Sequence, residues 1–374
     1  MIAGVPNQGG ATWAVLQYLL GFKRLGHEVC FVEPLTKDSL RPVGTILAES
    51  ENARYFHAVM DEFGLSECSA LLLEGTQETT GLSYDCLRKI AARADLLVNV
   101  SGMLKDECLT ARIPARVYLD LDPAFNQLWH AAEGIDVGFD GHTHFVTVGE
   151  RMGKPDCTVP TCGLSWITTL QPIVLSDWPI ANGVRHDALT TIGNWRGYGS
   201  IEYEGVFYGQ KAHSLRQFID LPKLTDEKFS LALAIHREEQ NDLAALQTNG
   251  WELLDPVQVA STPSRYRQFI QTSKAEFGIA KSGYVASRCG WFSDRSICYL
   301  ASGRPVMAQE TGFSRYLPTG EGLFSFETKE DVLAGIDEVN RDYARHLRAA
   351  RAIAEEYFDS DKVLSRLLQA VGVG

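Results

Sequence analysis

The sequence lacks features that define several classes of protein. It has no run of eighteen or more apolar residues, so we expect no membrane-spanning helix. It has no excess of positive charge, because 35 lysines and arginines stand against 47 aspartates and glutamates, a net charge of −12. An acidic chain repels polyanions, which disfavours nucleic-acid binding as the main task. With 45% hydrophobic and 22% charged residues, the composition is that of an ordinary globular protein.

The eight cysteines form no dense framework of the kind found in small secreted domains. The N-terminus, MIAGVPNQGG, has no cationic start and no signal-peptide core. We therefore expect reduced thiols and a cytoplasmic location. Cys157 and Cys162, with His142 and His144 upstream, offer four metal ligands, but their spacing matches no common zinc module, so we expect no metal.

Strand-like apolar runs alternate with helical patterns, which is typical of α/β proteins with parallel sheets. In the first half, we predict helices over residues 13–24, 51–63 and 84–94, and strands over residues 1–6, 27–33, 70–73, 96–100, 117–120 and 144–148. In the second half, we predict strands over residues 189–195, 231–236, 277–280 and 305–308, followed by a mostly helical end from residue 329 to residue 368.

This pattern predicts two Rossmann-like domains that face a cleft. Residues 1–165 form the first domain, 166–187 a linker with Pro and Trp, 188–350 the second domain, and 351–374 a helical tail that crosses back to the first. Ligands in such sheets bind beyond the carboxyl ends of the strands, so we expect the site in the cleft.

The segment SGYVASRCGWFSDRSICYLASGRPVMAQ, residues 282–309, carries the most informative pattern. Ser293 is a good N-cap for a helix over residues 294–302, Gly303 is a C-cap, and Pro305 prevents continuation. A helix N-terminus offers free N–H groups and partial positive charge, which suit a pyrophosphate.

Three residues in the first turn of that helix, Asp294, Arg295 and Ser296, are candidate donor-binding residues. Arg295 can bind phosphate with two hydrogen bonds, and Ser296 can donate one from its hydroxyl. The alternative is that Arg295 pairs with Asp294 or another local carboxylate.

This segment resembles the nucleotide-sugar site in the C-terminal half of GT-B glycosyltransferases. The resemblance covers residues 273–326 and rests on Gly283, Gly290, the run ASGRPV at 301–306 and ETG at 310–312. The run DRS at 294–296 looks most like the branch related to spore-maturation glycosyltransferases. RCGWFS at 288–293 looks like the HCGWNS run of family-1 transferases.

The resemblance implies roles for further residues. Glu310, Thr311 and Gly312 would bind hydroxyl groups of the donor sugar, although the same residues also suit an ordinary turn. Gly9 and Gly10 would face the donor diphosphate. The chain departs from the family where a glutamate usually binds the ribose, since Cys298 stands there, and the glutamate pair of many retaining family-4 enzymes is also missing. The stereochemistry therefore stays open.

Asn194 and Trp195 follow a predicted strand in a glycine-rich loop and are also candidate donor-binding residues. The indole could stack on a base, whereas the alternative is an ordinary interdomain loop. We expect Lys211 and His236 to be structural or solvated.

The acceptor side is predicted at the end of strand 117–120. Asp120 would contact the acceptor, together with Asn126 and Gln127 just beyond it. Asp122 and His144 are the two candidate general bases for an acceptor hydroxyl, because a strand-end carboxylate and a histidine can both take a proton. The alternative for the aspartates is a cap for the following helix.

We therefore expect a metal-independent glycosyltransferase of the hexosyltransferase class that uses a UDP, dTDP or GDP sugar as co-substrate and needs no further cofactor. The acceptor would be a small molecule or a glycan, and the sequence leaves a homodimer open. The rival hypotheses are a nucleotide-sugar epimerase of the same fold, a non-catalytic nucleotide-sugar-binding protein and, third, a dehydrogenase. The run Gly4–Val–Pro–Asn–Gln–Gly9–Gly10 is not G-x-G-x-x-G, which weakens the third.

Overall fold

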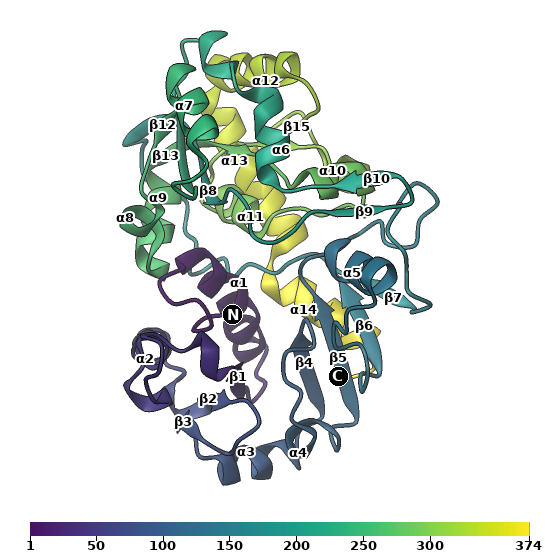
Figure 1. The fold of residues 1–374 in the computed structure, drawn as a ribbon. Helices are drawn as coiled ribbons and strands as arrows, with labels where there is room; N and C mark the ends of the chain where they lie inside the picture. Colours follow the sequence, from purple (N-terminus) through teal and green to yellow (C-terminus); the bar gives the residue numbers. More distant parts are fainter. Residues whose placement is uncertain (374) are drawn as a thin grey trace.

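A computed structural model describes residues 1–373, and Figure 1 shows that they form an upper and a lower lobe joined at a waist. The lower lobe holds the first seven strands, β1 to β7, and the upper lobe holds the six-stranded sheet. Each described helix is too short or too polar to cross a bilayer.

The lower lobe contains two sheets where one was expected. In the first, β1 (Phe31–Leu35), β2 (Ser69–Leu73) and β3 (Thr79–Gly81) lie in that order, with β1 and β2 parallel. The strand predicted over residues 1–6 is wrong. The backbone N–H groups of Ile2, Ala3 and Gly4 instead donate to the carboxylate of Glu33, over 2.7–2.9 Å.

The second sheet of the lower lobe is entirely parallel. Its order is β4 (Leu96–Val100), β5 (Ala115–Asp120), β6 (His144–Thr147) and β7 (Trp166–Thr168). β7 falls within the residues predicted as linker. The helices of this lobe are α1 (Gly9–Arg24), α2 (Glu51–Glu62), α3 (Tyr84–Ala91), α4 (Glu107–Thr110) and α5 (Phe125–Glu133).

The sheet of the upper lobe is parallel throughout. Its order is β12 (Glu252–Leu253), β11 (Phe229–Ala234), β8 (His186–Asn194), β13 (Ser273–Gly278), β14 (Val306–Gln309) and β15 (Leu323–Phe326). Its helices are α6 (Lys211–Leu215), α7 (Gln240–Thr248), α8 (Pro256–Ala260), α9 (Pro263–Thr272), α10 (Ser282–Ser287), α11 (Asp294–Ala301) and α12 (Lys329–Arg341). Near-continuous apolar strands such as FSLALA in β11 are typical of a parallel sheet covered on both faces.

Two segments cross between the lobes. The hairpin of β9 (Ile201–Tyr203) and β10 (Val206–Tyr208) leaves the upper lobe and packs against α5. The chain end runs through α13 (Tyr343–Ile353) and a π-helical turn (Ala354–Phe358) into α14 (Ser360–Ala370), which packs on α1 of the lower lobe (Figure 1).

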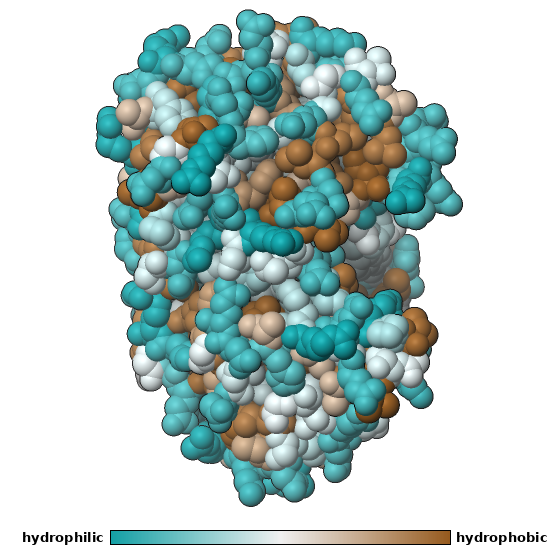
Figure 2. All heavy atoms as spheres, turned by 90° about the vertical axis from the view of Figure 1, so that its left-hand side faces the viewer, coloured by the Kyte–Doolittle hydropathy of each residue, from teal (hydrophilic) through white to brown (hydrophobic). Residues whose placement is uncertain are grey.

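Apolar side chains hold these crossings together. Leu364 and Leu367 of α14 are buried with Tyr18 of α1 and Val117 of β5. Full burial of one leucine side chain stabilises by about 1.5–3 kcal/mol, so this helix contributes substantially to the joint between the lobes. Figure 2 shows one face of the molecule, where hydrophilic side chains predominate and apolar side chains gather mainly on the upper lobe.

Candidate functional site

The start of α11 lies at the boundary between the lobes, facing α1. Ser293 caps it, because its hydroxyl oxygen accepts a hydrogen bond from the backbone N–H of Arg295. Asp294 lines a small cavity of about 10 Å³ together with Trp13 and Tyr18 of α1. The helix predicted to bind a diphosphate therefore begins where the two lobes meet.

Arg295 is buried and already paired with a carboxylate. Its Nε donates to Glu276 on β13, and its Nη1 donates to the carbonyl oxygen of Ile192 at 2.9 Å. Glu276 is fully buried, and its Oε2 has no partner among the described residues. Glu276 is thus the local carboxylate that the alternative interpretation of Arg295 required.

Lys211, the first residue of α6, lies next to Arg295. A Cβ atom added to Gly193 would lie 3.1 Å from Lys211 Nζ and 3.8 Å from Arg295 Nη1, so both cations approach the carboxyl end of β8. Lys211 is 8% exposed. Within residues 1–373 its ammonium group makes no hydrogen bond and no ion pair. Burial, and then the charge of Arg295, lower the Lys211 pKa well below its usual value.

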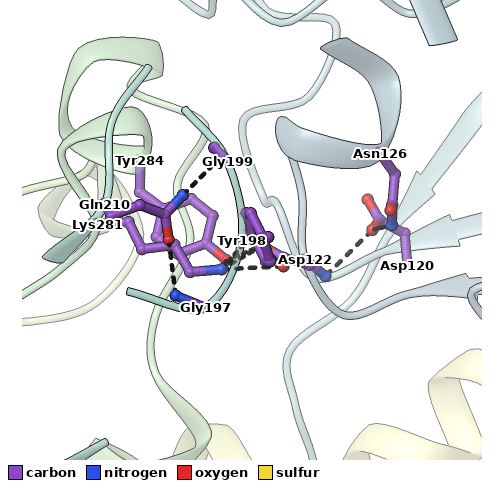
Figure 3. Close-up of polar contacts among 9 residues, drawn as sticks. All are labelled: Asp120, Asp122, Asn126, Gly197, Tyr198, Gly199, Gln210, Lys281 and Tyr284. Atoms are coloured by element: carbon purple, nitrogen blue, oxygen red, sulfur yellow. Dashed lines mark hydrogen bonds and ion pairs between the residues drawn. The ribbon is translucent and has the colours of Figure 1, made fainter. Parts of the chain in front are cut away.

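The position of Lys211 is fixed by the residue before it. Gln210 accepts a hydrogen bond from the backbone N–H of Gly197 at 3.3 Å and donates one to the carbonyl oxygen of Gly199 at 3.1 Å (Figure 3). The backbone N–H of Ala212 also donates to the carbonyl oxygen of Trp195 at 3.1 Å. These bonds hold the loop after β8 against the start of α6 and keep the lysine inside.

Of the remaining predicted residues of the α11 turn, Ser296 is buried and Asp294 is half-buried. Ser296 is 1% exposed. Burial raises the pKa of Asp294 above its ordinary value, while Arg295 and backbone N–H groups oppose that rise. Cys298, at the position where the resembling families have a ribose-binding glutamate, lines the same small cavity as Asp294. Burial raises the pKa of its thiol well above the usual range, so Cys298 is neutral.

The turn at residues 310–312 follows β14 and reaches the lower lobe. Glu310 accepts a hydrogen bond from the backbone N–H of Gly312, and Thr311 donates one to the carbonyl oxygen of Trp291. Gly312 has φ +100°, and a Cβ atom there would lie 2.7 Å from Cδ of Arg151. Glycine is therefore needed both for the backbone conformation and for the contact between lobes.

Of the other predicted donor residues, Asn194 lies at this end of β8, whereas Trp195, Gly9 and Gly10 pack against other parts of the chain. Trp195 is 1% exposed, and its indole Nε1 donates to Asp242 at 2.9 Å inside the upper-lobe core. Asn194 ends β8 and is exposed. Gly9 and Gly10 begin α1. A Cβ atom added to Gly9 would lie under 3 Å from Thr262, and one added to Gly10 would lie under 3 Å from Tyr266, so the two glycines pack closely against these residues.

The predicted acceptor residues form a buried network at the end of β5. Asp120 is fully buried and accepts hydrogen bonds from Asn126 at 2.9 Å, Gln127 at 2.8 Å and Thr147 at 2.9 Å. Burial raises the pKa of Asp120 to about 6, although these three hydrogen bonds oppose the rise. Figure 3 shows the Asp120 carboxylate bonded to Asn126 and also to the backbone N–H of Asp122.

The Asp122 side chain joins the lobes (Figure 3). Its carboxylate oxygens lie 3.0 and 3.1 Å from Nζ of Lys281, and it accepts hydrogen bonds from the hydroxyl groups of Tyr198 and Tyr284. The ammonium group lies 4.1 Å from the centre of the Tyr198 ring. We call Asp122, Lys281, Tyr198 and Tyr284 the interlobe cluster.

The second candidate base lies far from this cluster. His144 is the first residue of β6 and pairs with Val117, whereas Thr147 at the other end of β6 pairs with Asp120. Three residues of strand span about 10 Å, so His144 is at the opposite edge of the sheet from the lobe boundary. The two candidate bases do not share a site. No group of three or more His, Cys, Asp or Glu side chains within residues 1–373 is arranged to hold a metal ion.

The sequence patterns indicated no binding role for Lys211, Lys281 or Glu276. The lysine follows Gly209–Gln210 at the start of a helix, but whether it is buried depends on the loop after β8, far away in sequence. The usable signal was Glu276 itself, a charged residue directly before the apolar Phe277 in the segment that forms β13.

A scan against protein-family models and a search of curated proteins both find no match to this sequence. Solved structures do resemble the fold. An alpha-glucosyltransferase, solved with UDP and a 13-mer DNA containing a HMU base, matches 100% of this chain and 98% of its own, with a TM-score of 0.61 and 12% identity.

Two bacterial proteins give similar results. Anabaena HepE, solved with UDP-glucose, matches over 99% of this chain and 97% of its own, with a TM-score of 0.57 and 12% identity. A glycosyltransferase from Rickettsia africae matches over 97% and 94%, with a TM-score of 0.52 and 12% identity. The chain has the GT-B glycosyltransferase fold, which confirms the fold class expected from residues 273–326.

Proposed function

We propose that this chain is a glycosyltransferase that takes a sugar from a nucleoside-diphosphate sugar bound at the carboxyl ends of β8 and β13. One observation carries the proposal: Lys211 is a buried ammonium group, held next to Arg295, that makes no hydrogen bond and no ion pair within residues 1–373. Buried charges are normally paired, so this arrangement favours an anionic ligand.

A diphosphate fits this place chemically. Lys211 offers three N–H donors, and the guanidinium group of Arg295 adds positive charge although Glu276 already holds its Nε. Fixed cations in a poorly hydrated site stabilise the negative charge that develops on a leaving diphosphate. We therefore propose that this role needs no metal. An anion here would also raise the Lys211 pKa again.

UDP is the first nucleotide to test, because the alpha-glucosyltransferase was solved with UDP and Anabaena HepE with UDP-glucose. The assignments of Asp294, Ser296 and the 310–312 turn to the donor, and of Asp122 to proton removal, stay predictions. A cytoplasmic location, which fits the eight free cysteines, also stays a prediction, and so does a homodimer.

The test is a thermal-shift titration with UDP, dTDP and GDP on the wild type, Lys211→Met and a control, Lys223→Ala. Lys223 is an exposed lysine of the same lobe. At a hundredfold excess over Kd, a ligand stabilises by about 2.7 kcal/mol. We expect one nucleotide to raise the Tm of the wild type and the control, and Lys211→Met to lose most of that rise.

Methionine nearly matches lysine in shape and carries no charge. Removing an unpaired buried charge should leave the ligand-free protein at least as stable as the wild type. A Lys211→Met protein with an undiminished nucleotide shift would remove Lys211 from the donor site. A wild type that responds to none of the three nucleotides would contradict the proposed function itself.

A further inference from the structure

A polar hollow lies beside the proposed donor site, between the lobes. Its volume is about 380 Å³, which falls in the range of about 300–1,000 Å³ usual for small-molecule sites. Arg151 and Asp156 line it from the lower lobe, and Arg288, Glu310, Arg315 and Glu327 are among the residues that line it from the upper lobe.

The hollow and the two buried cations, Lys211 and Arg295, lie at different points along the carboxyl edge of the upper-lobe sheet. β14, which leads into Glu310, is two strands away from β8, which leads to Gly193. Neighbouring strands are about 4.8 Å apart, so roughly 10 Å separates the two places. A donor with its diphosphate on Lys211 and its sugar directed along the strand ends would present that sugar to the hollow.

Arg151 lines the hollow and contacts residues of both lobes. Its backbone N–H donates to the carbonyl oxygen of Cys289 at 2.9 Å, and this hydrogen bond joins the two lobes. Its side chain packs against two glycines. A Cβ atom added to Gly290 would lie 2.8 Å from the Arg151 side chain, and one added to Gly312 would lie 2.7 Å from it. Its guanidinium group pairs with Asp156, while its Nε has no partner among the described residues.

The other two arginines, Arg288 and Arg315, make fewer polar contacts than Arg151. Arg288 lies 3.8 Å from Glu327, and both side chains are more than half exposed. Arg315 makes no ion pair and no side-chain hydrogen bond within residues 1–373. Arg288 also has φ +49°, which is uncommon for a residue with a side chain. These guanidinium groups are therefore free to donate hydrogen bonds into the hollow.

The lining favours a neutral ligand rich in hydroxyl groups. Every lining residue is charged, a serine or glycine, so an apolar acceptor would find no apolar surface. Carboxylates stand beside the arginines, and the whole chain has a net charge of −12, so a polyanion such as nucleic acid would be repelled. A hydroxyl group both donates and accepts, and matches guanidinium and carboxylate groups together.

We propose that the hollow is the acceptor site and that the acceptor is a saccharide. This inference rests on the proposed function, since it places the acceptor next to a sugar held by the proposed donor site. In transfer, the bond between the donor sugar and its diphosphate breaks and a bond from that sugar to an acceptor oxygen forms. The nucleoside diphosphate leaves, and the acceptor hydroxyl loses its proton.

The experiment measures nucleoside diphosphate release from UDP-glucose, dTDP-glucose and GDP-mannose, with and without acceptor. One panel contains glucose, galactose, mannose, N-acetylglucosamine and their β-1,4-linked disaccharides. A second panel contains apolar alcohols and phenols. The variants are Arg315→Ala and Glu327→Gln, and the control is Arg341→Ala, an exposed arginine of α12 paired with Glu338.

We expect at least one saccharide to increase release and to appear in a product. Hydrogen bonds to charged groups are stronger than those between neutral groups, so Arg315→Ala should raise the KM of that saccharide at least about tenfold. The change should fall on the saccharide KM rather than the donor KM, and Arg341→Ala should change neither.

Three results would overturn the saccharide site. Apolar acceptors could stimulate release where saccharides do not, no saccharide could act although the donor is bound and slowly hydrolysed, or both variants could leave the saccharide KM unchanged. Loss of the proposed function gives a different result, because then no nucleotide shifts the wild-type Tm and none of the three donors releases its diphosphate.

Discussion

The carboxyl ends of β5 and β8 both carry buried charged side chains, and they differ in how completely those side chains are partnered. At β5, Asp120 accepts three side-chain hydrogen bonds and Asp122 is ion-paired with Lys281. At β8, Lys211 has no hydrogen-bond or ion-pair partner within residues 1–373, although Arg295 beside it is paired. A buried charge whose hydrogen bonds are all made costs less stability than a buried charge left unpaired, and only the unpaired charge favours a ligand.

The largest expected effect is on Arg295. Arg295→Met leaves Glu276 buried without its cation, and breaking a buried ion pair costs about 3–5 kcal/mol. Urea unfolding should therefore show a large loss of stability, in contrast to the Lys211→Met variant in the same place. The double variant Arg295→Met/Glu276→Gln should recover part of that loss. Equal stability of Arg295→Met and the wild type would contradict the distinction between the two cations.

The next effect tests the buried carboxyl of β5. The native pKa of Asp120 is about 6, above its ordinary value, so between about pH 4 and pH 6 the native state holds a proton that the unfolded chain has released. Stability from this group is therefore present at low pH and falls as the pH rises through that window, by about 3 kcal/mol for two pKa units.

Asp120→Asn does not titrate and serves as the reference for that change. The unfolding free energy of the wild type minus that of Asp120→Asn should fall from pH 4 to pH 7 and then level off. Urea denaturation of both proteins at each pH gives the difference, in which other titrating groups largely cancel. A constant difference across the range would mean that Asp120 is not held at a raised pKa.

A smaller effect is expected in the interlobe cluster. Asp122 and Lys281 are partly exposed, with side chains 28% and 21% exposed, so their pairing should be weaker than that of Glu276 and Arg295. A double-mutant cycle of Asp122→Asn and Lys281→Met should give a coupling energy of about 1 kcal/mol, against several for the buried pair. A coupling energy as large as that of Glu276 and Arg295 would contradict the expectation that the partly exposed pair is the weaker one.

The smallest effect concerns the space around Lys211. Gly193→Ala adds a methyl group 3.1 Å from Nζ and should displace the ammonium group, weakening UDP binding about threefold, or about 0.6 kcal/mol. Gly199→Ala in the loop that follows β8 is the control, because nothing lies within 4 Å of its added Cβ atom. Isothermal titration calorimetry with UDP measures both, and equal Kd values would contradict this placement of Lys211.

Local patterns predicted most of the elements. The runs LLVNV and VYLD lie in strands β4 and β5, and Ser293 caps α11 as its position indicated. These signals are local, since strand propensity and a cap depend on a few neighbouring residues. The run at residues 1–6 looked equally strand-like, but Glu33 takes up its backbone N–H groups, and that contact spans about thirty residues of sequence.

The candidate site was harder to predict for the same reason. Trp195 stands in a glycine-rich loop and looks exposed, yet Asp242, on α7, accepts its indole N–H and keeps it in the core. Lys211 looks like a surface lysine because no acidic residue lies within residues 205–219 that could pair with it and show that it is buried. Partners brought together by the sheet decide which charges are satisfied, and those partners are distant in sequence.

The most direct test of the account is a crystal structure of the protein with UDP. We predict that phosphate oxygens lie within about 3 Å of Lys211 Nζ, the usual length of such a bond, with the Arg295–Glu276 pair still formed. A UDP molecule bound elsewhere, with the Lys211 ammonium group still unpaired beside Gly193, would contradict the central claim.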